Sequence, residues 1–285
     1  MRSSRPAGFA DRFGSRSAFP YLLGLFFLVS LAVSLRLAQV DPRLLVEPVA
    51  LANLGRFVRG MFPPELSPTF LGIVGPAILE TIQISVMGTV VACLFAIPLG
   101  VLAASSLTWS GVLHERAGRW HQVAWFGPYA MSRLLLSLFR SIPELVWALL
   151  FVRAVGLGPF AGVLALGISY GGMLGKVYSE ILEGVNPRPL EALHAGGAGK
   201  LGIILYGLVP QALPSLLSYT LYRWECAIRA SALLGFVGAG GLGQQIELSM
   251  RMFQFNEILT LLGTLFVLVA AVDFVSGRIR ASLVR

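Results

Sequence analysis

Long apolar stretches dominate this sequence and restrict what it can fold into more than any other feature. Of its 285 residues, 56% are hydrophobic and only 13% are charged. A soluble domain usually carries about 25% charged residues. The core of a soluble protein cannot absorb that much apolar surface, whereas a lipid bilayer can. The sequence therefore predicts an all-α, polytopic membrane protein.

Six of the apolar stretches are long enough to cross a bilayer. They cover approximately residues 19–35, 78–105, 134–155, 161–181, 207–234 and 258–275. A cleaved signal peptide is the alternative for the first stretch, but its apolar run is longer than a signal core and no A-x-A-like site follows it. The fourth stretch is rich in glycine, which lets membrane helices approach closely. We expect a single transmembrane domain over residues 1–285.

The arginines lie at the edges of the apolar stretches, which fits membrane topology better than a nucleic-acid-binding face. Residues 1–18 carry four arginines against one acid, and the C-terminal tail carries Arg278, Arg280 and Arg285. Residues 109–133 also carry an excess of arginine, and residues 183–205 contain Arg188 and Lys200. The positive-inside rule then places both termini and these connections in the cytoplasm. Six spans with both ends on one side is a self-consistent topology.

The passage LEALHAGGAGKLGIILYGLVP, residues 190–210, is the longest polar connection between two apolar stretches. Two prolines precede it and Glu191 lies in its first turn, which favours the start of a helix. Glycines at 196, 197 and 199 then interrupt that helix, and a second one begins at Leu201. We expect a short helix, a bend and a second helix at the membrane surface.

Motifs for catalysis or metal binding are scarce in this chain. Neither lysine-bearing glycine stretch, residues 171–176 or 196–200, has the G-x-x-x-x-G-K-[ST] spacing of a nucleotide-binding loop. No cluster of histidine, cysteine and carboxylate residues has the spacing of a metal site. A membrane-bound enzyme is therefore a poor fit, and we expect no cofactor to be bound by this chain.

Polar residues inside the apolar stretches are candidates for a translocation path, because each is costly in hydrocarbon. Ser218, Tyr222, Glu225 and Arg229 recur on one face of a helix. Glu225 and Arg229 also have the spacing of an acid–base pair. They could line a path, or they could only neutralise each other at a helix contact. Arg223 lies off this face.

Three further groups of polar or glycine residues have two interpretations each. Glu144 could face the path or pair with Arg140 four residues earlier. Gln83, with Thr81 and Ser85, could bind a polar solute or hold helices together. The glycine-rich run at 235–243 is irregular backbone, which is tolerated only against water or protein. It is a candidate periplasmic gate, with Gly238, Gly240, Gly241 and Gly243 as its residues.

Four passages together resemble the permease subunits of phosphonate-type ABC importers. They are residues 144–166, the 190–210 connection, residues 216–243 and residues 251–256, and they include VGLGPFAGVLAL, LSYTLYR and FVGAGGLG in this order. Glu191-Ala192, Gly197 and Pro210 resemble the EAA loop, by which such permeases contact an ATPase. Leu193 stands where that loop usually has alanine, and Gly207 and Val209 replace an isoleucine and a leucine. The likeness covers about residues 70–285.

The resemblance implies a type I importer permease in the bacterial inner membrane. It implies alternating access, a second permease copy (a homodimer is expected), two ATPase subunits that bind ATP and Mg, and a periplasmic solute-binding protein. The coupling loop would be residues 188–205, with these contacts: Glu191, Ala192, His194, Gly197 and Lys200.

The substrate implied is a phosphonate or a reduced phosphorus oxyanion such as phosphite or hypophosphite. An anion needs donors and a cation along its path. We expect Arg229, and less directly Arg223, to attract it, with Gln83 opposite them as a donor. A methionine-type or other importer shares the loop and the gate. An ion-coupled secondary transporter is a more distant alternative, which inverted repeats and two broken helices would favour.

Overall fold

The computed structural model describes residues 19–38, 47–108 and 119–283, and all regular structure within these ranges is helical. Contacts divide the chain into two units, one ending at Val58 and the other beginning at Arg59. The first unit holds α1 (Phe19–Leu37) and most of α2 (Pro48–Gly60). α1 is apolar and long enough to span a bilayer, as predicted. The predicted cytoplasmic segment 1–18 lies outside the described residues, and the single domain stays a prediction.

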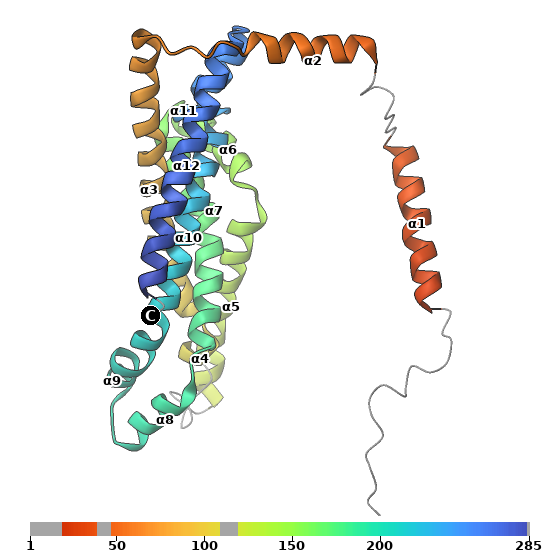
Figure 1. The fold of residues 1–285 in the computed structure, drawn as a ribbon. Helices are drawn as coiled ribbons and strands as arrows, with labels where there is room; N and C mark the ends of the chain where they lie inside the picture. The colour runs from red at the N-terminus through yellow and green to blue at the C-terminus, as the bar shows by residue number, and fades with distance from the viewer. Residues whose placement is uncertain (1–18, 39–46, 109–118, 284–285) are drawn as a thin grey trace, which may run out of the picture. The chain divides into compact units, whose positions relative to one another are not determined.

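The second unit is a bundle of helices (Figure 1). Its long helices are α3 (Pro68–Ala103), α5 (Arg119–Ser141), α7 (Pro159–Glu183), α10 (Val209–Gly235) and α12 (Phe255–Leu283). Its short helices are α4 (Ser105–Thr108), α6 (Glu144–Val155), α8 (Pro187–Ala195), α9 (Lys200–Gly202) and α11 (Gly241–Arg251), with the π-helical segment η4 (Ile203–Leu208) between α9 and α10. Figure 1 shows α8 and α9 at one end of the bundle, here called the loop end, and α11 toward the other, the glycine end.

Five described helices are long and apolar enough to cross a membrane, and the number is six if the bent pair α5–α6 counts as one span. This agrees with the predicted six. The third span, however, is not a continuous helix over 134–155. It breaks at residues 142–143, because Pro143 has no backbone N–H to donate, and its two parts are bent by 89°. Residues 119–133, predicted to be a loop, form about the first two thirds of α5.

The second span begins earlier than predicted, at Pro68 instead of residue 78. The hydroxyl of Ser67 accepts a 3.4 Å hydrogen bond from the backbone N–H of Phe70. Serine is a favoured N-cap and proline a favoured first helical residue, so this local sequence starts the helix. Residues 68–77 are mostly apolar, and the prediction began the span only after the glycine and proline residues at 75 and 76.

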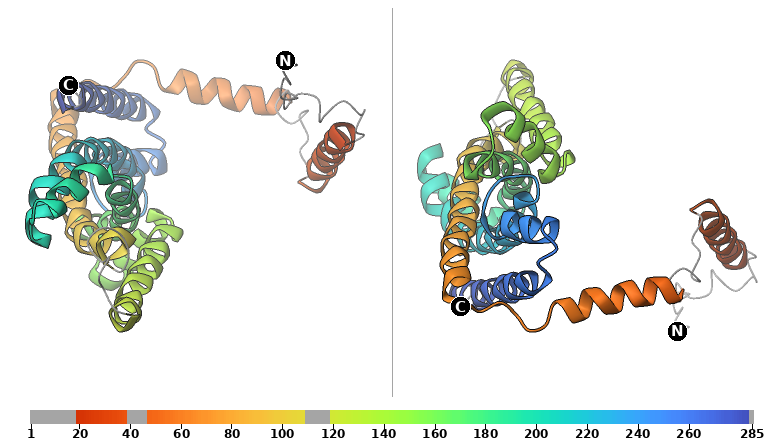
Figure 2. Two further views of the ribbon diagram at one scale, coloured as in Figure 1. Left: turned by 90° about the horizontal axis from the view of Figure 1, so that it is seen from below. Right: turned by 90° about the horizontal axis from the view of Figure 1, so that it is seen from above.

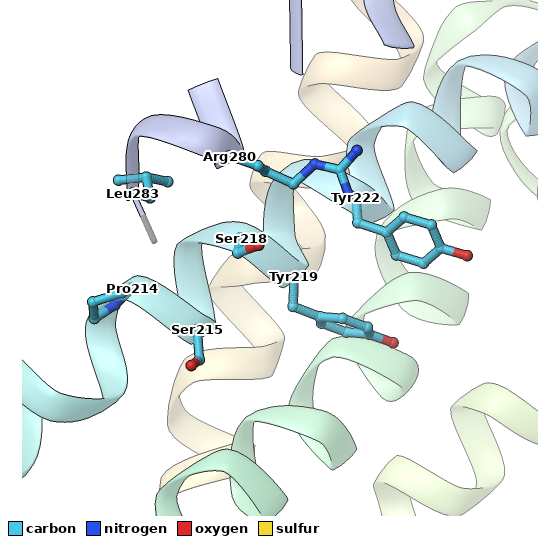
Figure 3. Close-up of a pocket in the computed structure, with 7 residues that line it drawn as sticks. All are labelled: Pro214, Ser215, Ser218, Tyr219, Tyr222, Arg280 and Leu283. Carbon is cyan, nitrogen blue, oxygen red and sulfur yellow. The ribbon is translucent and has the colours of Figure 1, made fainter. Parts of the chain in front are cut away.

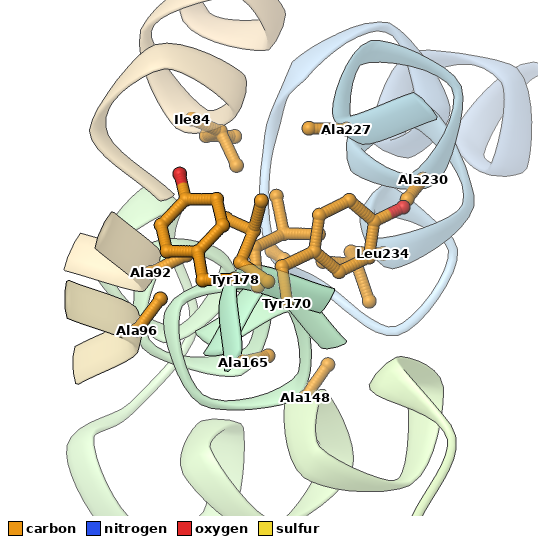
Figure 4. Packing of buried hydrophobic residues seen from close by; sticks show 13 residues of the cluster. Ile84, Ala92, Ala96, Ala148, Ala165, Tyr170, Tyr178, Ala227, Ala230 and Leu234 are labelled. Carbon is orange, nitrogen blue, oxygen red and sulfur yellow. The ribbon is translucent and has the colours of Figure 1, made fainter. Parts of the chain in front are cut away.

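Helix α7 lies at the centre of the bundle and contacts α3, α5, α6 and α10 (Figure 2). A Cβ atom on Gly167 would lie 2.4 Å from the side chain of Val91, and one on Gly175 would lie 2.5 Å from that of Leu136. The predicted role of these glycines in close helix packing is thus confirmed. Figure 4 shows the adjoining core, where small alanine side chains surround the buried rings of Tyr170 and Tyr178.

Candidate functional site

Helix α10 carries most of the predicted path residues, and α12 supplies their charged partners. The Glu225 side chain is only 6% exposed, and its Oε1 accepts a 2.7 Å hydrogen bond from Arg280 of α12. Arg229 is about half exposed and pairs with Asp273, also on α12, at 3.4 Å. The predicted Glu225–Arg229 pair is therefore wrong, because each residue pairs with the neighbouring helix instead.

Burial explains why the pairs form between helices. An ion pair between neighbouring turns of one helix contributes only about 0.2–0.5 kcal/mol. A buried carboxylate such as Glu225 needs a well-placed partner to offset the loss of its hydration. Sequence reasoning missed Arg280 because it was counted with the arginines of the cytoplasmic tail. No hydropathy or spacing signal relates residue 280 to residue 225.

Arg223 has a different environment, made of aromatic rings. Its Nε donates a 2.9 Å hydrogen bond to the hydroxyl of Tyr219. Its guanidinium also lies 5.5 Å from the Tyr219 ring centre and 5.6 Å from that of Tyr170 on α7. No carboxylate of the described residues forms an ion pair with it. By charge, Arg223 is the more available cation, although Arg229 was the preferred prediction.

Glu144 lies in the first turn of α6, after the break in the third span. The helix dipole favours a carboxylate at this position. Among the described residues it forms no ion pair with Arg140, because the break separates the two into different helices.

Gln83 lies on a different face of α3 from its predicted neighbours Thr81 and Ser85. Thr81 and Ser85 are fully buried, and the Thr81 carbonyl accepts a 3.3 Å hydrogen bond from Ser231 of α10. Gln83 is exposed, since two residues along a helix correspond to about 200° around its axis. Gln83 therefore does not share a face of α3 with Thr81 and Ser85, and its place across from Arg223 and Arg229 stays a prediction.

A cavity of about 560 Å³ lies between α10 and the last turns of α12 (Figure 3). It contains two of the predicted path residues, Ser218 and Tyr222, and two that were not predicted, Tyr219 and Arg280. Its complete lining is Pro214, Ser215, Ser218, Tyr219, Tyr222, Arg280 and Leu283. The α10 hydroxyls at 215, 218, 219 and 222 have the spacing of one helical face. That spacing is a signal that the sequence carried.

At the loop end, the predicted helix, bend and helix are confirmed. α8 ends at Ala195, and Gly197 has a left-handed backbone with φ +83°. The N–H of Ala198 donates a 3.0 Å hydrogen bond to the carbonyl of Leu193, as in a glycine-terminated helix. A Cβ atom on Gly197 would meet nothing within 4 Å. Glycine is therefore favoured here by its backbone conformation and not by crowding.

The two faces of α8 differ in their surroundings. Leu190 and Leu193 contact η4: a Cβ atom on Gly207 would lie 2.6 Å from Leu190 Cδ2 and 3.0 Å from Leu193 Cδ1. Leu193 and Gly207, both departures from the EAA pattern, are thus in contact and complementary in size. The predicted coupling residues are all exposed, and they are Glu191, Ala192, His194, Gly197 and Lys200.

The glycine end is irregular in the way predicted. Gly238, Gly240 and Gly241 all have positive φ angles, of 90°, 88° and 73°. These are conformations that side chains disfavour. Gly243 is required for another reason, because a Cβ atom there would lie 1.7 Å from the carbonyl oxygen of Ala232. All four candidate gate glycines therefore occupy positions that other residues would strain.

Two side chains of α3 hold this glycine turn in place, and neither was predicted to do so. Glu80 Oε2 accepts a 2.7 Å hydrogen bond from the N–H of Gly241, the first residue of α11. The Thr81 hydroxyl accepts a 2.9 Å hydrogen bond from the N–H of Leu242. These bonds satisfy N–H groups at a helix start that have no partner within the helix, and the negative carboxylate suits the helix dipole.

Comparisons with known proteins identify the family. The phosphite transport system permease protein PtxC of Stutzerimonas stutzeri is 34% identical over 76% of this chain and 73% of its own length. The phosphate-import permease protein PhnE of Mycolicibacterium smegmatis is 34% identical over 84% of this chain and 43% of its own length. A solved chain of the MetNI methionine ABC transporter matches the fold with a TM-score of 0.64 and 25% identity, over 77% of this chain and all of that chain. The family model of the binding-protein-dependent transport system inner membrane component matches residues 127–285, and the chain belongs to this family of ABC importer permeases.

Proposed function

We propose that this multi-pass membrane protein imports a phosphonate or a related reduced phosphorus oxyanion, such as phosphite or hypophosphite, by alternating access. The observation that carries the anion class is the charge of α10 and its partners. Arg229 and Arg280 pair with Asp273 and Glu225 at the contact between α10 and α12, while Arg223, beside Tyr219 and Tyr170, lacks a carboxylate partner among the described residues. Relatives named for phosphite and phosphate support the same class.

The partners follow from the two ends of the bundle. At the loop end, the exposed face of α8 would dock on an ATPase subunit, and two such subunits would bind ATP and Mg. A periplasmic solute-binding protein would bind at the glycine end, and this chain itself would hold no cofactor. A second identical copy would complete the path across a bacterial inner membrane, with both termini in the cytoplasm.

A methionine-type importer is the second candidate, favoured by the fold match to the MetNI permease. Methionine is a zwitterion, so its path requires no excess of positive charge. Among the described residues, Arg223, Arg229 and Arg280 outnumber their carboxylate partners by one, and this positive excess suits an anion better than a zwitterion.

Uptake into proteoliposomes tests the function directly. The permease, its ATPase and its binding protein would be reconstituted, and ATP-dependent uptake of phosphite, methylphosphonate, phosphate and methionine compared. We expect uptake of at least one phosphorus oxyanion and none of methionine. Methionine uptake alone would refute the proposed substrate class. Uptake by the permease without any ATPase would refute the ABC assignment of its energy source.

Topology can be tested with one cysteine. With Cys93 and Cys226 replaced by serine, a cysteine at Ala198 would report on the exposed bend of the coupling loop. We expect a membrane-impermeant maleimide to label it only in permeabilised cells. Labelling in intact cells would place the loop outside and overturn the proposed docking of α8.

A further inference from the structure

The cavity between α10 and α12 is unusually rich in hydroxyl groups for a membrane-spanning region. Four of its seven lining residues carry hydroxyl groups, and they are Ser215, Ser218, Tyr219 and Tyr222. A fifth lining residue, Arg280, carries a guanidinium. Figure 3 shows these side chains along one side of α10, with Arg280 reaching toward Tyr222 from α12. The guanidinium carbon of Arg280 lies 6.0 Å from the Tyr222 ring centre.

Much of this hydrogen-bonding capacity is unused within the described residues. The hydroxyls of Ser215, Ser218 and Tyr222 form no hydrogen bond with any described group. Arg280 gives one Nη2 hydrogen bond to Glu225, while its Nε is buried and has no partner. A guanidinium has five N–H donors, so Arg280 retains donors for a second acceptor. Polar groups without partners are costly inside a membrane, which indicates that something polar binds here.

The chemistry of these donors selects the ligand. Hydroxyls can donate to any oxyanion, and a guanidinium matches the spacing of two oxygens on one phosphorus atom. Glu225 already compensates most of the charge of Arg280, while Arg223 adds a cation one helical turn away, bonded to Tyr219. Such a site would hold an anion weakly, and weak binding is what a conducting path requires for release.

We infer that this cavity is an oxyanion site inside the permease, formed by Arg280 with the hydroxyls of Ser218 and Tyr222. The inference rests on the proposed function, because it gives the transported phosphorus oxyanion a resting position on the loop-end half of α10. The phosphate of a lipid headgroup has the same chemistry. The experiment must therefore distinguish a free anion from a lipid.

The test uses a double variant that removes only hydroxyls, Ser218→Ala with Tyr222→Phe. It keeps the Arg280–Glu225 pair, so the bundle should still assemble. Its matched control is Tyr21→Phe with Ser34→Ala on α1, which removes the same two groups outside the bundle. Permease–ATPase complexes in phosphatidylcholine nanodiscs, without binding protein, would be titrated with phosphite and with phosphate. Arg280→Lys provides a second measurement, because lysine keeps the charge but not the paired donors.

We expect the hydroxyl variant to bind phosphite about tenfold more weakly, as the loss of two ordinary hydrogen bonds predicts, and the control to bind normally. Native mass spectrometry provides the lipid arm: an anionic phospholipid retained by the wild type and lost from the variant would support the site with a lipid as its ligand. Unchanged anion binding and unchanged lipid retention would overturn the inference. If wild-type proteoliposomes import no phosphorus oxyanion, the proposed function fails. If they do, and the variant imports it with unchanged KM and rate, this site alone fails.

Discussion

Gly207→Ile tests whether α8 is positioned by its contact with η4. An isoleucine Cβ would lie 2.6 Å from Leu190 Cδ2 and 3.0 Å from Leu193 Cδ1, so both leucines must move or α8 must shift. Overpacking of this kind costs about 1–3 kcal/mol. If this energy destabilises the docked position of α8, the equilibrium constant between the docked and displaced positions changes by roughly 5- to 150-fold. We therefore expect lower transport and weaker stimulation of the ATPase by the binding protein.

The matched rescue is Leu193→Ala in the same chain, which restores the residue types usual in the EAA loop. Alanine removes the Cδ1 atom that Gly207→Ile would meet, so that only the terminal Cδ2 of Leu190 still has to move. We expect the double variant to recover most of the stimulated ATPase activity, which the single Gly207→Ile variant loses. Equal losses in single and double variants would refute the complementarity of the two positions. So would a Gly207→Ile complex with normal coupling.

Three other predictions concern the ion pairs, the glycine end and pH. Arg280→Gln should destabilise the permease by about 3–5 kcal/mol, because it leaves the buried Glu225 unpaired. Asp273→Asn should lower the thermal midpoint less, since the Arg229–Asp273 pair is half exposed. Glu80→Leu should raise ATPase activity measured without binding protein several-fold, while Glu80→Gln, which can still accept from Gly241, should change it little. Hydrogen bonds from Ser67 hold the pKa of the Glu65 carboxyl below its usual range. The stability that they contribute is present at neutral pH and is lost as pH falls through the lowered pKa. Glu65→Gln should therefore flatten the loss of thermal stability in acid, measured as the thermal midpoint against pH.

The sequence predicted the features that follow from local chemistry. Apolar length located the spans, glycines with positive φ marked the turns at 197 and 238–241, and the loop 188–205 folded as expected. Each of these depends on residues close together in the chain. The break at Pro143 was also readable in principle, because proline cannot continue a hydrogen-bonded helix.

Partners between helices could not be read from spacing along one helix. Glu225 and Arg229 have the sequence separation of an ion pair within one helix, yet each forms an ion pair with a residue of α12, which is distant in sequence. Glu80 is a carboxylate in a long apolar span, but nothing in the neighbouring sequence indicated that it accepts a hydrogen bond from Gly241. Helical faces also need their neighbours: Thr81 and Gln83 are two residues apart, and only packing decides which is buried.

The arrangement connects the two ends of the bundle through one helix. Residues 200–235 form a continuous helical segment of 36 residues, roughly 54 Å long at the α-helical rise. It begins beside α8 and ends at the glycine turn, where Gly243 packs directly on Ala232. A shift of α8 that moves η4 therefore acts on the same helical segment that supports α11. Because the Glu80 and Thr81 bonds tie α11 to α3, such a shift must either break these bonds or carry α3 with it. The cavity lies along α10, between the loop end and the glycine end. A movement at either end would therefore change how tightly a bound anion is held there.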